Sequence, residues 1–214
     1  VGSGRTEIVR AIFGADKSID INIEIDGKPV NIRNPRHAKN LGIGLVPEDR
    51  KEQGLILPFT VEHNISMACL SDICYLGFID KQKERNIAQK QVESLSIKTP
   101  STKAFAKNLS GGNQQKCILS RWLEINPRIL ILDEPTRGID VGAKYEIYLL
   151  MNKIIEDGGS IIMISSELPE VLNMSNRVIT VCDGRITGEF DPSEVSVDTI
   201  MASALKFEEE EMIS

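Results

Sequence analysis

Residues 109–116 read LSGGNQQK and residues 129–140 read ILILDEPTRGID, and these two stretches decide the fold. The apolar run over 129–132 predicts a strand that is buried on both faces of a parallel sheet. Asp133 then lies at the carboxyl edge of that sheet, where α/β folds bind their ligands. We expect Asp133 to bind Mg²⁺, and we expect the neighbouring Glu134 to act as a general base on an attacking water.

The first of these stretches predicts a helix that opens at Ser110, Gly111 and Gly112 and runs to about residue 123. The free N–H groups and the positive dipole end of such a helix form an anion site that suits a phosphate group. Glycine lets the backbone approach a ligand closely. We therefore predict that this turn binds nucleotide, together with Asn113 and Gln114 in the residues that follow it.

A second glycine-rich segment, VGSGRT, occupies residues 1–6. It matches the end of the phosphate-binding pattern GxxxxGK(S/T), with Gly4 as the second glycine. Arg5 stands where the pattern has lysine, and Thr6 supplies the hydroxyl group that binds Mg²⁺. The predicted nucleotide-binding residues of this segment are Gly2, Ser3, Gly4, Arg5, Thr6 and Glu7. The three motifs, at 1–6, 109–116 and 129–140, each lie on the type of element that nucleotide binding requires. The chance occurrence of all three in one chain is improbable.

The remaining segments alternate between strand-like and helix-like patterns, which is typical of an α/β fold. Strands are predicted at 19–25, 42–46, 128–132, 161–164, 177–181 and 185–190, and the strand at 161–164 is expected to be buried. Helical character is predicted over 6–13, 59–94, 110–123, 144–156, 168–172 and 197–205. Asp26-Gly27 and Asp183-Gly184 are turn signals between strands.

The composition fits one large globular α/β domain: 214 residues, of which 41% are hydrophobic and 26% charged, with a net charge of −6. This acidic balance argues against a nucleic-acid partner, because phosphate contacts rely on clustered lysine and arginine. No apolar run approaches the roughly 20 residues that cross a bilayer. Four cysteines without a CxxC pair make a zinc site improbable, so we expect buried reduced thiols. His37 and His63 are expected on the surface or in packing roles.

On these motifs the chain resembles the ATP-binding-cassette ATPases over nearly its whole length. It is most similar to the second ATPase domain of the tandem subunits that drive bacterial import of ribose, galactose or xylose. The closer match rests on GRTE at 4–7, PEDR at 47–50, LSGGNQQK at 109–116, DEPTRGIDVGAK at 133–144 and SSELPEV at 165–171. The resemblance implies an α/β fold with a P-loop NTPase core of ATP-binding-cassette type. It implies a single domain over 1–214, with a helical subdomain near 58–126 and a small antiparallel β portion near 19–33.

The resemblance also implies roles for individual residues. Residues 109–112, here called the signature turn, are similar to the family loop that contacts the γ-phosphate of ATP held by the opposite domain. Asp133 and Glu134 match the Mg²⁺ carboxylate and the catalytic base. Asp140 belongs to the loop that links the two sites of a dimer, and we include it among the nucleotide-binding residues.

Three positions depart from the family pattern. Glu48 falls where the family has a glutamine that touches Mg²⁺ and reports to the permease, which makes it a metal and catalytic candidate. Ser166 falls where the family has a histidine that contacts the γ-phosphate, and it could also cap the helix predicted at 168–172. Arg5 replaces a compact ammonium with a planar fork, which is not a conservative change. We infer that this domain's own site is weakened and that it mainly donates its signature turn to a partner domain.

The implied cofactors are ATP and Mg²⁺. The implied partners are a sister ATPase domain, a second copy of the ATPase subunit or domain, a transmembrane permease and, indirectly, an external sugar-binding protein. The expected location is the cytoplasmic face of the bacterial plasma membrane. We also expect the strand that precedes the phosphate loop, and a first ATPase domain with a complete GK(S/T) loop, to lie upstream of Val1.

Other interpretations stay open at this point. The chain could be a non-catalytic regulatory nucleotide-binding half, or an ATPase for import of another small solute such as a nucleoside. A DNA-repair or chromosome ATPase of the same superfamily fits less well. Those proteins insert a long coiled coil between the phosphate loop and the signature turn. Here about 100 residues separate these two segments, and they contain no sustained heptad repeat.

Overall fold

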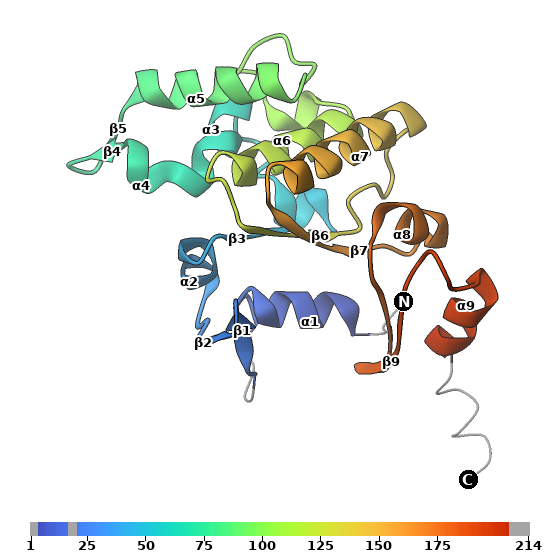
Figure 1. The fold of residues 1–214 in the computed structure, drawn as a ribbon. Helices are drawn as coiled ribbons and strands as arrows, with labels where there is room; N and C mark the ends of the chain where they lie inside the picture. The colour runs from blue at the N-terminus through green and yellow to red at the C-terminus, as the bar shows by residue number, and fades with distance from the viewer. Residues whose placement is uncertain (1–3, 17–20, 206–214) are drawn as a thin grey trace. The chain divides into compact units, whose positions relative to one another are not determined.

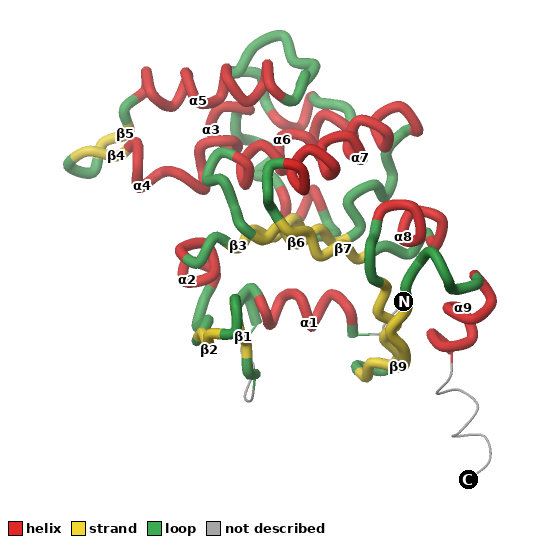
Figure 2. The backbone as a smooth tube through the Cα atoms, viewed as in Figure 1, coloured by secondary structure: helices red, strands yellow, loops and turns green. Residues whose placement is uncertain are grey.

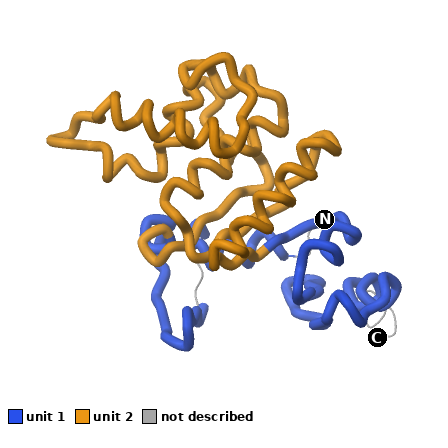
Figure 3. The backbone as a smooth tube through the Cα atoms, turned by 45° about the horizontal axis from the view of Figure 1, so that its top comes forward, with its two compact units in different colours: residues 1–38, 163–214 blue, residues 39–162 orange. Residues whose placement is uncertain are grey.

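The computed structural model describes residues 4–16 and 21–205. The chain divides into two compact units, which Figure 3 shows in different colours. Unit 1 comprises residues 1–38 and 163–214, and unit 2 comprises residues 39–162. Figure 2 shows that strands and helices alternate along the chain, as the sequence patterns predict.

Unit 2 is built on a parallel pair of strands, β3 (Ile43–Val46) and β6 (Ile129–Asp133). Val46 lies opposite Leu132, so the two strands end at the same edge of the sheet. The central strand β6 is fully buried over 130–132, where each side chain is 0% exposed. This burial confirms the prediction from its continuous apolar run.

β7 (Ser160–Ile164) completes this sheet in the order β3-β6-β7. The prediction that 161–164 is a buried strand is wrong, because Ile162 is 41% exposed and its neighbours are partly exposed. Among the described strands, β7 stands at the end of the order and has β6 as its partner on one side. β-branched apolar residues favour the strand conformation, so they also occur in edge strands, where they are not fully buried.

Helices gather on one side of the β3-β6-β7 sheet in unit 2 (Figure 1). The central one is α6, which contacts β3, α3, α5 and α7. In chain order the helical segments are η1 (Arg50–Gly54, a π-helical turn), α3 (Val61–Ser66), η2 (Met67–Cys69), α4 (Leu70–Ile73), α5 (Lys81–Ser94), η3 (Ala106–Asn108), α6 (Gly111–Leu123) and α7 (Val141–Glu156). No helix within residues 4–16 and 21–205 is long and apolar enough to cross a membrane.

The segment 59–94 departs from its predicted helical character in the middle. Thr60 is the N-cap residue of its first helix, and its hydroxyl oxygen accepts from the His63 N–H at 3.3 Å. A short hairpin of β4 (Cys74–Tyr75) and β5 (Phe78–Ile79) then interrupts the helices. Leu76 and Gly77 turn it with φ of 50° and 84°, the left-handed values that tight hairpins need.

Unit 1 carries the phosphate-loop helix and two small antiparallel hairpins. Its elements are α1 (Arg5–Ile12), β1 (Ile23–Ile25), β2 (Lys28–Val30), α2 (Pro35–Asn40, whose last two residues belong to unit 2), α8 (Leu168–Met174), β8 (Val178–Cys182), β9 (Arg185–Phe190) and α9 (Val197–Leu205). Both turn signals are confirmed, because Asp26-Gly27 joins β1 to β2 and Asp183-Gly184 joins β8 to β9, all with positive φ. The first strand begins at Ile23, and its predicted start at 19–20 lies outside the described residues.

The four cysteines are free thiols, as expected, but they are not all buried. Cys69 and Cys117 lie in the core, and burial raises the pKa of their thiols to about 11 and about 12. Cys74 is exposed at the hairpin and Cys182 is partly exposed. The prediction of buried thiols therefore holds for two of them and is wrong for Cys74, because the hairpin that carries it was not anticipated.

Candidate nucleotide site

The signature turn lies at the start of α6 in unit 2. Ser110 is the exposed N-cap residue in an extended conformation. Its hydroxyl oxygen accepts from Asn113 Nδ2 at 2.8 Å, and Asn113 Oδ1 accepts from the Lys98 N–H at 2.8 Å. Gln114 Nε2 donates to the Ala106 carbonyl oxygen at 3.2 Å. The side chains of Asn113 and Gln114 thus brace the turn, and their predicted role toward nucleotide stays a prediction.

The two glycines of the turn are enclosed by neighbouring backbone. A Cβ added at Gly111 would lie 3.3 Å from the Gly138 carbonyl oxygen. A Cβ added at Gly112 would lie 2.5 Å from Cβ of Ala143 in α7, which is closer than real atoms approach. Packing inside the domain therefore requires glycine at 112 and leaves little room for a side chain at 111.

The end of β6 presents two neighbouring carboxylates in different environments. Asp133 is 2% exposed, whereas Glu134 is partly exposed. Glu134 adopts a left-handed φ of 49°, which a residue with a side chain adopts rarely. Strained conformations of this kind cluster at functional sites. The backbone reversal directs the chain away from the sheet, and the Arg137 N–H donates to the Glu134 carbonyl oxygen at 3.2 Å.

Asp140 has a structural role that the motif does not reveal. It is the N-cap residue of the 16-residue helix α7, and its Oδ1 accepts from the Ala143 N–H at 2.9 Å. Its carboxylate therefore stabilises the first turn of that helix. Its assignment to nucleotide binding is a prediction that this contact neither requires nor opposes.

Glu48 follows β3 by two residues, so it lies at the same sheet edge as Asp133. Its carboxylate forms an ion pair with Arg137 in the loop after β6. The next residue, Asp49, caps η1 by accepting from the N–H groups of Lys51 and Glu52 at 2.8 and 3.0 Å. Those backbone hydrogen bonds lower the pKa of the Asp49 carboxyl group.

The phosphate-loop residues and Ser166 belong to unit 1. Gly4 has a φ of 86°, and a Cβ there would lie 3.1 Å from the Cα of Gly184, so glycine is needed on both counts. Arg5 begins α1, and its guanidinium donates to the Ser165 carbonyl oxygen at 3.3 Å. Arg5 thus contacts the residue that precedes Ser166, another departure from the family pattern. Thr6 and Glu7 follow in α1, while Gly2 and Ser3 lie outside the described residues.

The N-cap residue of α8 is Glu167 and not Ser166, and no side chain of the described residues caps this helix. The Ser165 hydroxyl oxygen accepts from the Glu167 N–H at 3.0 Å and donates to the Glu170 carboxylate. Ser165 is buried and Ser166 is exposed. The capping role considered for Ser166 is therefore wrong, because α8 begins after Glu167, one residue later than a cap at Ser166 would require.

The donor atoms at the sheet edge of unit 2 suit Mg²⁺. Carboxylate oxygens are the hard ligands that Mg²⁺ prefers, and Asp133 is a buried carboxylate at the end of a parallel strand. Glu48 adds a second carboxylate at the same edge. Asp133 and Glu48 are therefore the residues of unit 2 that would hold the ion, and the role expected for the Thr6 hydroxyl group in unit 1 stays a prediction.

Another group of possible metal ligands lies in the helical part of unit 2. Ligand atoms of Glu62, His63 and Glu84 are within 4.8 Å of one another. Both carboxylates already have partners: Ser66 and Lys81 donate to Glu84, and Thr102 donates to Glu62. These contacts fasten α3 to α5 and to the following loop. His63 Nε2 lies 3.9 Å from the Glu84 carboxylate, and its ring packs edge-on against Phe59, which agrees with the surface or packing role expected for His63.

The sequence motifs did not identify Arg50 and Arg137 as site residues, although both lie inside motif segments. The Arg50 guanidinium donates to the carbonyl oxygens of Arg137 and Gly138, the latter at 3.4 Å. The Arg137 side chain reaches back to Glu48. The only available signal was the occurrence of opposite charges in two loops that follow adjacent strands.

Comparison with known proteins agrees with these motifs. Residues 1–137 match the family model described as ABC transporter. The chain is 50% identical over 204 residues to the ribose import ATP-binding protein RbsA of Geobacillus kaustophilus, covering 95% of this chain and 41% of that protein. It is 50% identical over 205 residues to the xylose import ATP-binding protein XylG of Moorella thermoacetica, covering 95% and 40%. The chain thus spans about two fifths of the length of the curated relatives it matches.

Solved structures confirm the fold class. The ATP-binding cassette MJ1267 matches with a TM-score of 0.78 at 21% identity, covering 94% of this chain and 83% of that one. A dimeric structure of the cassette MJ0796 bound to ADP and phosphate matches with a TM-score of 0.73 at 23% identity, covering 89% and 81%. The predicted α/β fold of ATP-binding-cassette type is therefore confirmed, and the chain belongs to the ABC transporter family of ATP-binding cassettes.

Proposed function

We propose that this chain is the ATP-binding and ATP-hydrolysing part of a protein that powers import of a monosaccharide through a membrane permease. Its similarity to proteins named for ribose and xylose import supports the substrate class. The cytoplasmic face of the bacterial plasma membrane is the location that fits this role, because ATP is available there. A nucleoside or another small solute is the alternative cargo.

One observation carries the proposal: the exposed signature turn opens a 13-residue helix and is braced from several directions. The N–H groups at the start of such a helix, together with its dipole, favour a phosphate group. Ser110 is exposed, so another domain can reach this helix end. The turn therefore suits donation to ATP that a sister domain or a second copy of the subunit holds.

The residues proposed to act on ATP bound by this chain itself, here called its receiving site, include Asp133 and Glu134 of unit 2. Glu134 would accept a proton from the water that attacks the γ-phosphorus, and the bond from that phosphorus to the bridging oxygen of ADP breaks. Mg²⁺, when bound, would neutralise charge on the phosphate oxygens. Asp133 and Glu48 of unit 2 would hold this ion, the Thr6 hydroxyl group of unit 1 is the further ligand that the motif predicts, and Gly4 would let the loop backbone approach the phosphates.

This receiving site is weakened at two positions. The Arg5 guanidinium is engaged with the Ser165 carbonyl oxygen, and a planar fork is a poor substitute for a compact lysine charge. Ser166 offers a short hydroxyl group where a longer donor would be needed. Removing one donor that is aimed at the transition state costs about 10²–10³ in rate. We propose that this chain contributes more through its donated turn than through its own site.

The proposed assembly follows from this division. One ATP-binding-cassette domain over 1–214, with its helical subdomain near 58–126, would act with a sister ATPase domain and a second copy of the subunit. A transmembrane permease would carry the solute that an external sugar-binding protein delivers. A purely regulatory nucleotide-binding half is the second candidate, and the contact between Arg5 and Ser165 favours it.

Steady-state ATP hydrolysis by the complete protein, assembled with its permease, tests the proposal. Ser110→Arg places bulk and charge at the exposed helix end and should remove most of the turnover. We prefer it to a change at Gly111, because a side chain there would also crowd the Gly138 carbonyl oxygen inside the same domain. Ser101→Arg, at another exposed serine of unit 2, is the matched control.

Glu134→Gln completes the experiment and should lower turnover by a smaller factor than Ser110→Arg. If both variants abolish ATP hydrolysis to the same extent, this chain's own site and its partner's site are equally catalytic, and the inference from Arg5 is wrong. If neither variant changes hydrolysis, the nucleotide role itself must be abandoned. If only the Ser110 variant acts and Glu134→Gln has no effect at all, the regulatory alternative is favoured.

A further inference from the structure

Three loops of unit 2 meet at the guanidinium group of Arg50. This residue begins η1, two positions after Glu48. Its side chain donates to the carbonyl oxygens of Arg137 and Gly138 in the loop after β6. A Cβ added at Gly111 would lie 3.3 Å from that Gly138 oxygen and 3.6 Å from the Arg50 guanidinium. The guanidinium therefore lies beside the signature turn as well as the loop 137–140.

A second arginine connects the same two loops in the opposite direction. Arg50 reaches from the loop after β3 to the backbone of 137–138, and Arg137 reaches from the loop after β6 to the carboxylate of Glu48. Both contacts are exposed to solvent, but they differ in geometry, because the Arg50 guanidinium donates to two carbonyl oxygens and the Arg137 guanidinium pairs with one carboxylate. A single exposed ion pair contributes little, so the two hydrogen bonds of Arg50 should contribute more to holding the loop.

The loop 137–140 depends on such outside support. Gly138 has a φ of 66°, and the Ile139 N–H donates to Thr136 over a long 3.4 Å. The loop leads directly into α7, where Ala143 packs against Gly112. A shift at Gly138 would therefore reach the signature turn by two routes, through Gly111 directly and through the start of α7.

We infer that Arg50 is a positioning residue, whose guanidinium holds the loop 137–140 against Gly111 and so sets the position of the signature turn relative to Glu48. The Arg50 side chain is partly buried, and this burial lowers the pKa of its guanidinium group. The planar fork donates to two carbonyl oxygens at once, which a lysine ammonium cannot reproduce with the same geometry. The inference rests on the proposed function only where it concerns ATP turnover.

Amide hydrogen exchange of the nucleotide-free protein tests the contact without any activity. Arg50→Lys keeps the charge and removes the fork, so amides at 111–114 and 138–140 should exchange about tenfold faster. That factor corresponds to the loss of one charge-assisted hydrogen bond. Arg85→Lys is the matched control, because Arg85 is exposed on α5 and the described residues offer it no hydrogen bond or ion pair. Arg50→Gln, which retains a planar donor, replaces Arg50→Lys if the latter fails to fold.

ATP turnover of the complete transporter gives the second measurement. Arg50→Lys should lower kcat and leave KM for ATP near its original value, because the ATP-holding loops are unchanged. Unchanged exchange at 111–114 and 138–140 would overturn the inference, whatever the turnover shows. Faster exchange with unchanged kcat would show a bond without a positioning role and would also overturn it. If Ser110→Arg leaves ATP turnover unchanged while Arg50→Lys accelerates amide exchange, the proposed function is wrong, but the contact between Arg50 and the loop 137–140 is still supported.

Discussion

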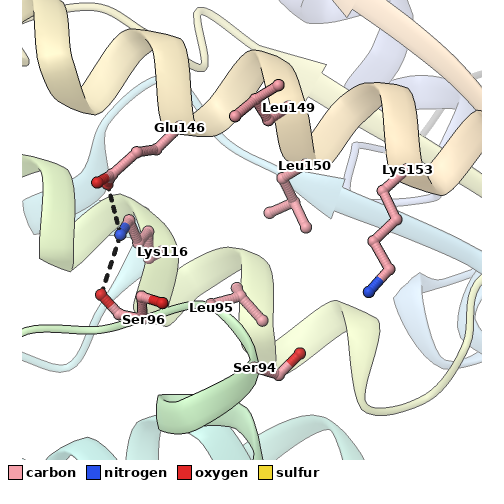
Figure 4. A pocket seen from close by; sticks show the side chains of 8 residues that line it. All are labelled: Ser94, Leu95, Ser96, Lys116, Glu146, Leu149, Leu150 and Lys153. Carbon is pink, nitrogen blue, oxygen red and sulfur yellow. Dashed lines mark hydrogen bonds and ion pairs between the residues drawn. The ribbon is translucent and has the colours of Figure 1, made fainter.

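Lys116, the last residue of the signature motif, provides a sharp test of how this domain is held together. Its side chain is 5% exposed, and its Nζ lies 2.5 Å from Glu146 Oε2 on α7 and donates to the Ser96 carbonyl oxygen at 3.1 Å. Glu146 is 46% exposed. Figure 4 shows the pair at one end of a pocket of about 270 Å³, with Leu95, Leu149 and Leu150 beside it. The two partners of one ion pair are therefore very differently solvated.

This difference predicts unequal effects of the two single substitutions. Glu146→Gln leaves a buried ammonium without its counter-charge, a change that costs about 3–5 kcal/mol in a fully buried pair. Because Glu146 is half-exposed and water reaches the pocket, we expect a loss of about 1–2 kcal/mol. Lys116→Met keeps most of the volume and returns Glu146 to water. It leaves the Ser96 oxygen without this donor and should cost less than about 1 kcal/mol.

Urea unfolding followed by the fluorescence of Trp122 measures both variants. Trp122 is the only tryptophan of the chain and lies on α6 with Lys116, so it reports on unit 2. With m near 2 kcal/mol/M, Glu146→Gln should lower the midpoint by about 0.5–1 M. Glu156→Gln, at an exposed position of the same helix, should leave it unchanged. If Lys116→Met destabilises as much as Glu146→Gln, burial of the ammonium is not the reason for the pair, and the argument is refuted.

Two further predictions follow from packing and from burial. Gly112→Ala should destabilise unit 2 by about 1–3 kcal/mol in the same assay because its Cβ would meet Ala143 at 2.5 Å, and adding Ala143→Gly should restore much of the loss; no rescue would contradict the packing role. At pH 8 a thiol reagent should modify Cys74 rapidly and leave Cys69 and Cys117 unmodified until the protein unfolds, which mass spectrometry of the labelled peptides can follow. Since both buried thiols have pKa values raised to about 11 and about 12, their contribution to stability is present below the ordinary thiol pKa and is lost as pH rises toward those values.

Much of the fold was predictable from sequence because its signals are local. The buried run at 129–132, the Asp-Gly turns and the start of α6 each depend on residues within a few positions of one another. The hairpin at 74–79 was missed because its strands are two residues long, too short for a period-two pattern to emerge. The exposure of β7 was missed because an apolar run does not reveal whether its strand lies at the centre or the edge of a sheet.

The sequence by itself determined the main candidates of the site, because its motifs name Asp133, Glu134 and the signature turn, although they do not name Arg50 and Arg137. Tertiary structure alone decided how they are supported. It joined the Ser165 hydroxyl group to Glu167 and Glu170, enclosed Gly112 against Ala143, and brought Arg50 to the loop 137–140, 87 and 88 positions away along the chain. Contacts of this kind form between side chains that are distant in sequence, and they depend on how β3 and β6 align at one sheet edge. A linear pattern records which residues are present, whereas this alignment decides which of them meet.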